Sequence, residues 1–215
     1  MKSKTISSID ELRQLLGKPH PLTVSKIGES LNDSARAFLQ RTPLLFMATS
    51  GSETGSTVSP KGDEAGFIQV LDDKTLHIPE RPGNKLMQGL GNILETGQIG
   101  LLAVIPGSEE TLRINGRACL LSDPELNQRY AARGKAAQLV IEVTVEQVYF
   151  HCAKAFKRSK AWEPDSWGPA HKVSFGEEIA SGKLGQSKSL TNRATRKALS
   201  KLVDKAVAED YKKNL

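Results

Sequence analysis

The sequence has few of the features that mark secreted, membrane-spanning or disulfide-rich proteins. Only two of its 215 residues are cysteines, Cys119 and Cys152, which are too few for a disulfide framework. No apolar run approaches the roughly 20 residues of a membrane-spanning helix, and the N-terminus lacks the apolar segment of a secretory signal. We therefore expect a cytoplasmic protein with reduced thiols and no membrane partner.

Motifs of the common catalytic chemistries are also missing. The sequence contains no HExxH, CxxC, GxSxG or Walker-type GK[ST] motif, and its four histidines are scattered, so we predict no metal site. His151 and Cys152 are adjacent, and neighbours on a strand point to opposite faces, which disfavours a Cys–His nucleophile pair. No catalytic residue can be named. If the protein is an enzyme, we expect its reactive atoms to belong to a cofactor.

Basic charge is plentiful and unevenly placed. The formal net charge is +6, and after Ala170 ten basic residues face five acidic ones, so most of the excess lies in the tail. Apolar residues at helical spacing from Ala198 to Ala206 predict a basic amphipathic helix there. This helix could dock on the rest of the chain, on a partner or on nucleic acid.

The middle of the chain reads as short apolar strands separated by turns. Pro60 lacks an N–H for a sheet ladder, so its strand should lie at an edge, and Gly116 and the break in alternation at Glu146–Gln147 predict irregular pairing. Helices are expected where Ser8 and Asn32 or Asp33 can cap them, from Leu86 to a stop at Gly97, and from Pro124 to about Arg133. The expected strands are 44–49, 56–61, 67–71, 75–78, 99–105, 111–121 and 138–150. The pattern predicts a mainly β protein with flanking helices, a six- to seven-stranded antiparallel barrel that is closed or partly split.

The stretch from Ile78 to Asn92 (IPERPGNKLMQGLGN) is the strongest candidate for a functional centre. A loop that enters a helix exposes unpaired backbone N–H groups, and Arg81 and Lys85 add two cations beside Asn84. These features suit a phosphate group, although a basic loop that merely caps a surface helix would have the same composition.

A second candidate lies in the stretch from His151 to Trp162. Lys154, Arg158 and Trp162 are spaced four residues apart, which puts them on one face of a helix. Such a face can be a solvated helix, an RNA platform or a lid over an anionic aromatic ligand.

Several stretches, taken in order, resemble one known family. They are SPKGD at Ser59–Asp63, IPERPGN at Ile78–Asn84, TLRINGRA at Thr111–Ala118 and FHCAKA at Phe150–Ala155. In this order and spacing the chain resembles the FMN-binding split-barrel family related to pyridoxamine 5'-phosphate oxidase. The resemblance extends from about Glu11 to Trp167.

The resemblance implies a homodimer with FMN at the subunit interface. It implies that the strand carrying Ser56, Val58, Ser59 and Lys61 runs beside the flavin ring, and that Lys61 could stabilise the reduced, anionic flavin. The ribityl chain and phosphate would be held by the segment that contains Ile78, Pro79, Arg81, Asn84 and Lys85. The remaining candidate cofactor-binding residues are Thr111, Arg113, Lys154 and Arg158.

The domains implied are an N-terminal helical segment (1–43), an FMN-binding split barrel (44–168) and a basic tail (169–215). Within the family, the chain most resembles an uncharacterised bacterial subgroup with the pattern SPRGD…PDRPGN…LRVNGRA…FHCAKA. Thr57 and Lys61 replace the aspartate and arginine usual in that subgroup. The C-terminal motif with which pyridoxamine 5'-phosphate oxidases hold their substrate is missing.

The implied function is that of an FMN-dependent oxidoreductase acting on an unidentified small molecule, with NADH or NADPH as a possible electron donor. A flavin-binding sensor or store without turnover is an alternative. A basic nucleic-acid-binding module is another, although we do not expect nucleic acid as a partner.

Overall fold

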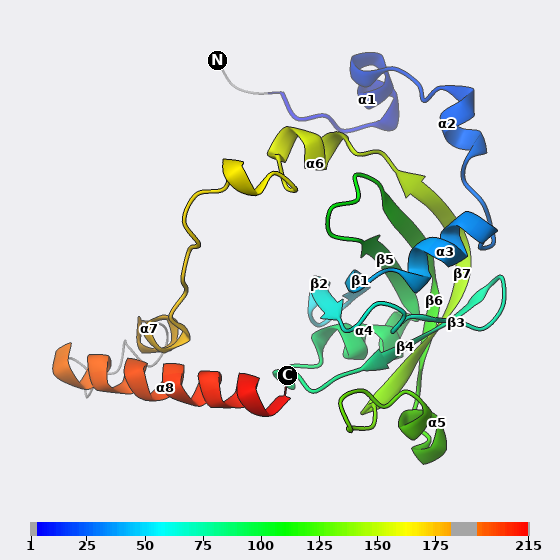
Figure 1. Cartoon of the computed structure of the whole chain (residues 1–215). Coiled ribbons are helices and arrows are strands. Elements are labelled where there is room, and N and C mark those ends of the chain that lie inside the picture. The colour runs from blue at the N-terminus through cyan, green and yellow to red at the C-terminus, as the bar shows by residue number, and fades with distance from the viewer. Residues whose placement is uncertain (1–3, 182–192, 215) are drawn as a thin grey trace. The chain divides into compact units, whose positions relative to one another are not determined.

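A computed structural model describes residues 4–181 and 193–214 of the chain (Figure 1). The chain forms two compact units, Met1–Glu163 and Pro164–Leu215, each described below by itself. Within the described residues, no helix combines the length and the hydrophobicity that a membrane span requires.

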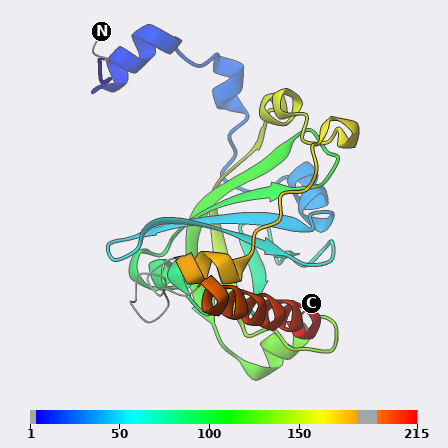
Figure 2. The same cartoon turned by 90° about the vertical axis from the view of Figure 1, so that its left-hand side faces the viewer.

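The first unit is built on a seven-stranded sheet in which every neighbouring pair is antiparallel. The strands, in the spatial order β2-β1-β5-β6-β7-β4-β3, curve strongly, as the two views show (Figures 1 and 2). This confirms the predicted mainly β, antiparallel split barrel. The strands are β1 (Leu44–Gly51), β2 (Gly55–Gly62), β3 (Gln69–Val70), β4 (Thr75–Glu80), β5 (Gln98–Val104), β6 (Thr111–Leu121) and β7 (Leu139–His151).

The helices begin where the sequence offers a cap. Ser8 accepts a hydrogen bond from Glu11 N, and Asn32 accepts one from Ala35 N, so each satisfies a free backbone donor of its helix. The helices of this unit are α1 (Ile9–Leu16), α2 (Pro21–Ser25), α3 (Asp33–Gln40), α4 (Gln88–Thr96), α5 (Pro124–Arg129) and α6 (Lys154–Ser159). α5 is shorter than predicted because Arg133 and Gly134, both at positive φ, form a tight turn after it.

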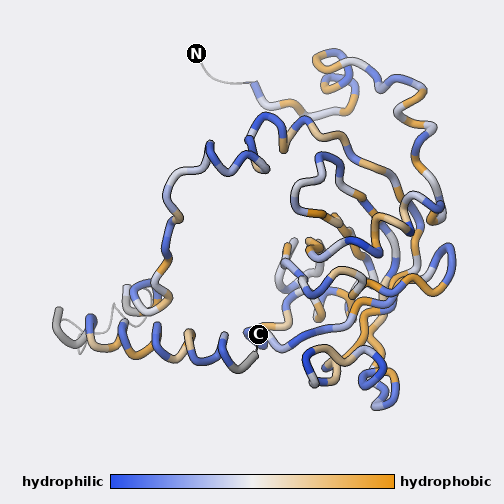
Figure 3. Tube along the Cα trace, in the orientation of Figure 1, coloured by the Kyte–Doolittle hydropathy of each residue, from blue (hydrophilic) through white to orange (hydrophobic). Residues whose placement is uncertain are grey.

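The hydrophobic core lies between the concave face of the sheet and helices α3 and α4. Figure 3 shows hydrophobic residues running along the strands. The largest fully buried side chains come from β1, β4, β6 and β7 and from α3, and include Leu39, Leu45, Met47, Leu76, Ile78, Leu112, Ile114 and Ile141. The core therefore fixes β4 directly, and it fixes β1, the strand with which β2 pairs. β2 and β4 flank the site described below.

β6 and β7 are paired irregularly at the point that the sequence predicted. Asn115 faces Gln147 and Gly116 faces Val145, so Glu146 is an extra residue on β7 and forms a bulge. A Cβ atom at position 116 would collide with the carbonyl oxygen of Thr144. Glycine is thus required where the bulge brings the two backbones together.

We expect Gly116→Ala to lower the free energy of unfolding by about 3 kcal/mol, because the added methyl group must displace a strand backbone. Denaturant unfolding measures this. Gly91→Ala in α4 is the control, since a Cβ atom there meets open space. Equal stability of the two variants would contradict the role of the bulge.

The second unit contains a short 3₁₀ helix (Pro164–Ser166) and two helices, α7 (Phe175–Ser181) and α8 (Arg193–Asn214), which pack together. Asp204 of α8 accepts hydrogen bonds from the Ser174 hydroxyl and from Gly176 N, 2.7 and 2.9 Å away, and so holds the start of α7. The basic helix predicted from Ala198 to Ala206 lies within α8. Lys183 and Lys188 of the predicted basic tail are outside the described residues.

Candidate functional site

A pocket of about 660 Å³ opens between β2 and the loop that joins β4 to α4. Its walls include six of the candidate cofactor-binding residues, namely Val58, Ser59, Lys61, Arg81, Asn84 and Lys85. The structure thus brings two segments about twenty residues apart in the sequence to one concave surface, which we call the β2–α4 pocket.

β2 forms one wall of this pocket and is the first strand of the sheet. It is paired with β1 on one side only, so its outer edge carries backbone groups that make no ladder hydrogen bonds. Pro60 lies on this strand, as predicted for an edge. An extended edge with free N–H and C=O groups can form hydrogen bonds with the rim of a flat, polar ring.

Two ion pairs close the sheet where no backbone hydrogen bonds do. The Lys61 Nζ of β2 lies 2.6 Å from Glu80 Oε1 of β4, with the two side chains only 16% and 14% exposed. Just beyond them, Arg81 Nε donates to Asp63 Oδ2 over 2.7 Å. These contacts join β2, the first strand in the sheet order, to the end of β4, the sixth. We refer to them as the closing ion pairs.

The other wall is the N-terminus of α4. The residue before the helix, Met87, has a positive φ and makes no side-chain capping bond, and Gln88, Gly89 and Leu90 of the first turn line the pocket. Their N–H groups and the helix dipole favour an anion. Lys85 stands beside them, exposed and, within residues 4–181 and 193–214, without an ion-pair partner. The Asn84 side chain accepts from Leu86 N and shapes the loop.

Asn92 fixes the position of this helix on the sheet. It is buried; its amide nitrogen donates to Thr49 Oγ1 and to the carbonyl oxygen of Gly55, and its Oδ1 accepts from Thr54 Oγ1 over 2.6 Å. These bonds tie α4 to the β1–β2 hairpin. The helix N-terminus and β2 are therefore held at a fixed separation on the two sides of the pocket.

The other candidates lie elsewhere. Ser56 lines a second pocket, of about 520 Å³, on β1, β2 and β5, and Thr111 and Arg113 line a third, largely apolar pocket of about 580 Å³. Ile78 is buried in the core and Pro79 faces a fourth pocket, so their side chains do not line the β2–α4 pocket.

Lys154 and Arg158 lie on α6, and neither lines any of these pockets. α6 ends at Ser159, and Trp162 folds back so that its ring stacks on Phe156 at 5.3 Å and its Nε1 donates to Ser108 O. The predicted helical face shared by Lys154, Arg158 and Trp162 is therefore wrong.

Sequence reasoning did not identify Glu80 and Asp63 as parts of the site. A signal existed, since a carboxylate stands next to Arg81 and another follows Lys61 by two residues. Cys119 is a poor nucleophile, because burial, together with the Glu142 carboxylate beside it, raises the pKa of its thiol.

Comparison with known proteins identifies the family. The family described as pyridoxamine 5'-phosphate oxidase matches residues 31–152, which is more than half of the chain. The chain belongs to this family. The match includes every strand and both walls of the β2–α4 pocket. No curated protein matches the sequence.

Several solved structures are similar to this chain at low sequence identity. HupZ of Group A Streptococcus is 19% identical with a TM-score of 0.46, and the match covers 56% of this chain and 93% of that one. A putative pyridoxamine 5'-phosphate oxidase from Lactobacillus delbrueckii is 20% identical, with a TM-score of 0.46 and coverages of 57% and 95%. An FMN-binding protein from Syntrophomonas wolfei is 10% identical, with a TM-score of 0.40 and coverages of 66% and 95%.

Proposed function

We propose that this protein is an FMN-dependent oxidoreductase that holds the cofactor in the β2–α4 pocket. The single observation that carries the proposal is the meeting of three features around one pocket: an edge strand, a helix N-terminus without a side-chain cap, and a lysine that makes no ion pair with any residue that the structure describes. A flavin nucleotide needs both an extended edge for its ring and a cationic, N–H-rich end for its phosphate. FMN, when bound, supplies a ring that carries a hydride or electrons to or from a small-molecule substrate.

Five residues of the pocket have distinct parts in this proposal. Lys85 and the first-turn N–H groups of α4 bind the phosphate, and Asn84 holds their loop in place. Arg81 adds positive charge, reduced by its pairing with Asp63. Val58 and Ser59 present the β2 edge to the ring, with the domain from 44 to 168 as the cofactor-binding unit.

We also propose a homodimer with the cofactor at the subunit interface. The third pocket is lined mainly by apolar atoms, from residues that include Phe46, Leu101, Leu102 and Phe156. Val58, which is 68% exposed, lines both this pocket and the β2–α4 pocket. A second copy that covered the apolar pocket would bury Val58 and shield the ring from water. Exposed apolar patches of this kind favour association with another protein surface.

The proposal is tested on purified protein. We expect a yellow preparation with flavin absorbance, FMN in the mass spectrum of the released ligand, and a dimeric mass by light scattering. Reduction by NADH or NADPH followed by substrate-dependent reoxidation would distinguish an oxidoreductase from a flavin store. A colourless protein that takes up no FMN when it is supplied in excess would refute the proposal.

The ion pair between Lys61 and Glu80 changes the effect that we expect from substituting Lys61. Because Glu80 already neutralises its ammonium group, Lys61→Met leaves an uncompensated carboxylate beside the pocket instead of simply removing a cation. We expect the midpoint potential of bound FMN to fall, since nearby negative charge disfavours the reduced anion. Lys61→Met/Glu80→Gln should recover most of the wild-type value in a redox titration. An unchanged potential in the single variant would place Lys61 too far from the ring.

A further inference from the structure

The fourth pocket, the one that Pro79 faces, has a volume of about 570 Å³ and shares Arg81 with the β2–α4 pocket. It is lined by the loop after β2, by β3 and β4, and by the segment Arg129–Arg133, which begins at the last residue of α5. Three of its lining residues are arginines, namely Arg81, Arg129 and Arg133. We call it the arginine pocket.

The charges of the arginine pocket do not cancel. The carboxylate of Asp63, only 3% exposed, is shared by two guanidinium groups, with Arg81 Nε at 2.7 Å and Arg133 Nη2 at 3.4 Å. In the part of the chain that the structure describes, Arg129 has no carboxylate within ion-pair distance. Glu64, at the exposed rim, is the second acidic group that lines the pocket. Three cations thus face two carboxylates, one of which is already shared.

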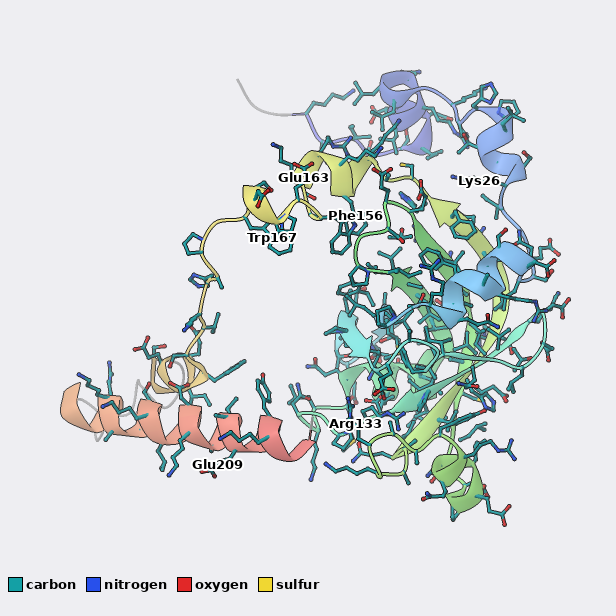
Figure 4. The ribbon with its side chains drawn as sticks, in the orientation of Figure 1. Lys26, Arg133, Phe156, Glu163, Trp167 and Glu209 are labelled. Atoms are coloured by element: carbon teal, nitrogen blue, oxygen red, sulfur yellow. The ribbon has the colours of Figure 1, made fainter. Side chains whose placement is uncertain are left out.

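The backbone is shaped to direct Arg133 to this place. Ala132 and Lys135 form an isolated bridge, and between them Arg133 and Gly134 have φ values of 50° and 75°. A left-handed conformation is unusual for an arginine and costs free energy that the surrounding structure must supply. Figure 4 shows Arg133 on the loop that follows α5. The turn holds its guanidinium over Asp63 although the side chain is 44% exposed.

The pocket also has an aromatic side. Phe67 is buried, and Phe67 and Pro79 line the pocket beside the ring of Tyr130. The Tyr130 hydroxyl lies 2.9 Å from Nδ1 of buried His77, whose Nε2 lies 2.9 Å from Glu142, and the Tyr130 carbonyl accepts from Arg81. Burial raises the pKa of the Tyr130 hydroxyl, so that it stays neutral. A preformed cavity with cationic and aromatic sides suits an anionic molecule with an apolar body.

We propose that the arginine pocket binds a small organic anion, through a carboxylate or phosphate group held between Arg129 and Arg133. The site is separate from the proposed flavin site and meets it only at Arg81. Guanidinium groups present paired donors that match both kinds of anion. Arg81 lines both pockets, so an anion bound in the arginine pocket also changes the electrostatic surroundings of the β2–α4 pocket.

The test is calorimetric titration of the full-length protein at low ionic strength, with citrate and inorganic phosphate as separate probes. We expect saturable binding of at least one probe, weakened about tenfold in Arg133→Gln, because one charge-assisted contact is lost. Arg129→Gln should have a similar effect and, since this side chain is exposed and outside the ion pairs, should leave folding unchanged. The probe that binds more tightly identifies the anionic group.

Two controls separate this proposal from the flavin proposal. Arg13→Gln removes an arginine that, like Arg133, is half-exposed and paired with an aspartate, but that does not line the arginine pocket. The affinity of this variant for citrate and for phosphate should therefore equal that of the wild type. Lys85→Gln removes the proposed phosphate-binding lysine and should leave citrate binding intact. Absence of saturable binding of both probes would overturn the proposal. So would binding that is lost in Lys85→Gln but kept in Arg133→Gln and Arg129→Gln, because the anion would then occupy the β2–α4 pocket.

Discussion

Asp63→Asn should lower the free energy of unfolding by about 2–4 kcal/mol, the largest stability change that we expect from a single isosteric substitution. The carboxylate is 3% exposed and is the common partner of Arg81 and Arg133, so its neutralisation leaves two guanidinium groups without a counter-charge. It also breaks one of the closing ion pairs between β2 and β4. At about 2–4 °C per kcal/mol for a domain of this size, the melting temperature should fall by about 4–16 °C.

Asp10→Asn is the matched control for this experiment. Asp10 is also paired with an arginine, Arg13 at 3.7 Å, but it is 82% exposed, and exposed pairs contribute little. Thermal unfolding of the two variants should therefore differ clearly. Similar melting temperatures for both would mean that the sheet is closed by backbone packing alone and that the ion pairs across it are incidental.

Lys85→Glu should weaken FMN binding about a hundredfold, since it removes one charge-assisted contact with the phosphate and adds a repulsive charge. This expectation rests on the proposed function. Lys85 is exposed, so the substitution should leave the melting temperature of the cofactor-free protein close to that of the wild type. Quenching of FMN fluorescence on titration with protein measures the affinity directly.

Lys18→Glu provides the same change of charge at an exposed position of the N-terminal segment, outside every pocket described above. It controls for the loss of overall positive charge, and FMN affinity should be unchanged at moderate ionic strength, where distant charges are screened. If Lys85→Glu and Lys18→Glu bind FMN equally well, the phosphate does not lie at the start of α4.

Much of the fold was predictable because its signals are local. Ser8 and Asn32 cap the helices that follow them, Pro60 lies on an edge strand, and Gly116 marks the bulge. The two caps depend on donors within a few residues. Pro60 and Gly116 stand out by what each residue type lacks, an N–H group in proline and a Cβ atom in glycine. The prediction that Trp162 continues the helical face of Lys154 and Arg158 was wrong. Lys160, at a positive φ, ends the helix, and the Trp162 indole donates a hydrogen bond to Ser108, 54 residues away in the sequence.

The site was predictable only in part. Arg81, Asn84 and Lys85 were found from the cationic loop that enters a helix and from family motifs, and the residues of β2 from the motifs alone; six of these residues line one pocket. Ile78 was assigned to the same segment, yet its side chain lies in the core, because successive side chains of β4 point in opposite directions. A motif identifies a segment, whereas the strand register decides which of its side chains face the pocket.

The sequence alone determined the strands, the caps, the bulge and the family, since these depend on short-range periodicity and on motifs. Only the tertiary structure decided that Lys61 is neutralised by Glu80, that Asp63 is shared by two arginines and that Arg81 separates two pockets. Partners 18 and 19 residues apart meet because the sheet curls until its first strand approaches its sixth. That curvature arises from twist accumulated over the whole sheet, which no single stretch of sequence encodes.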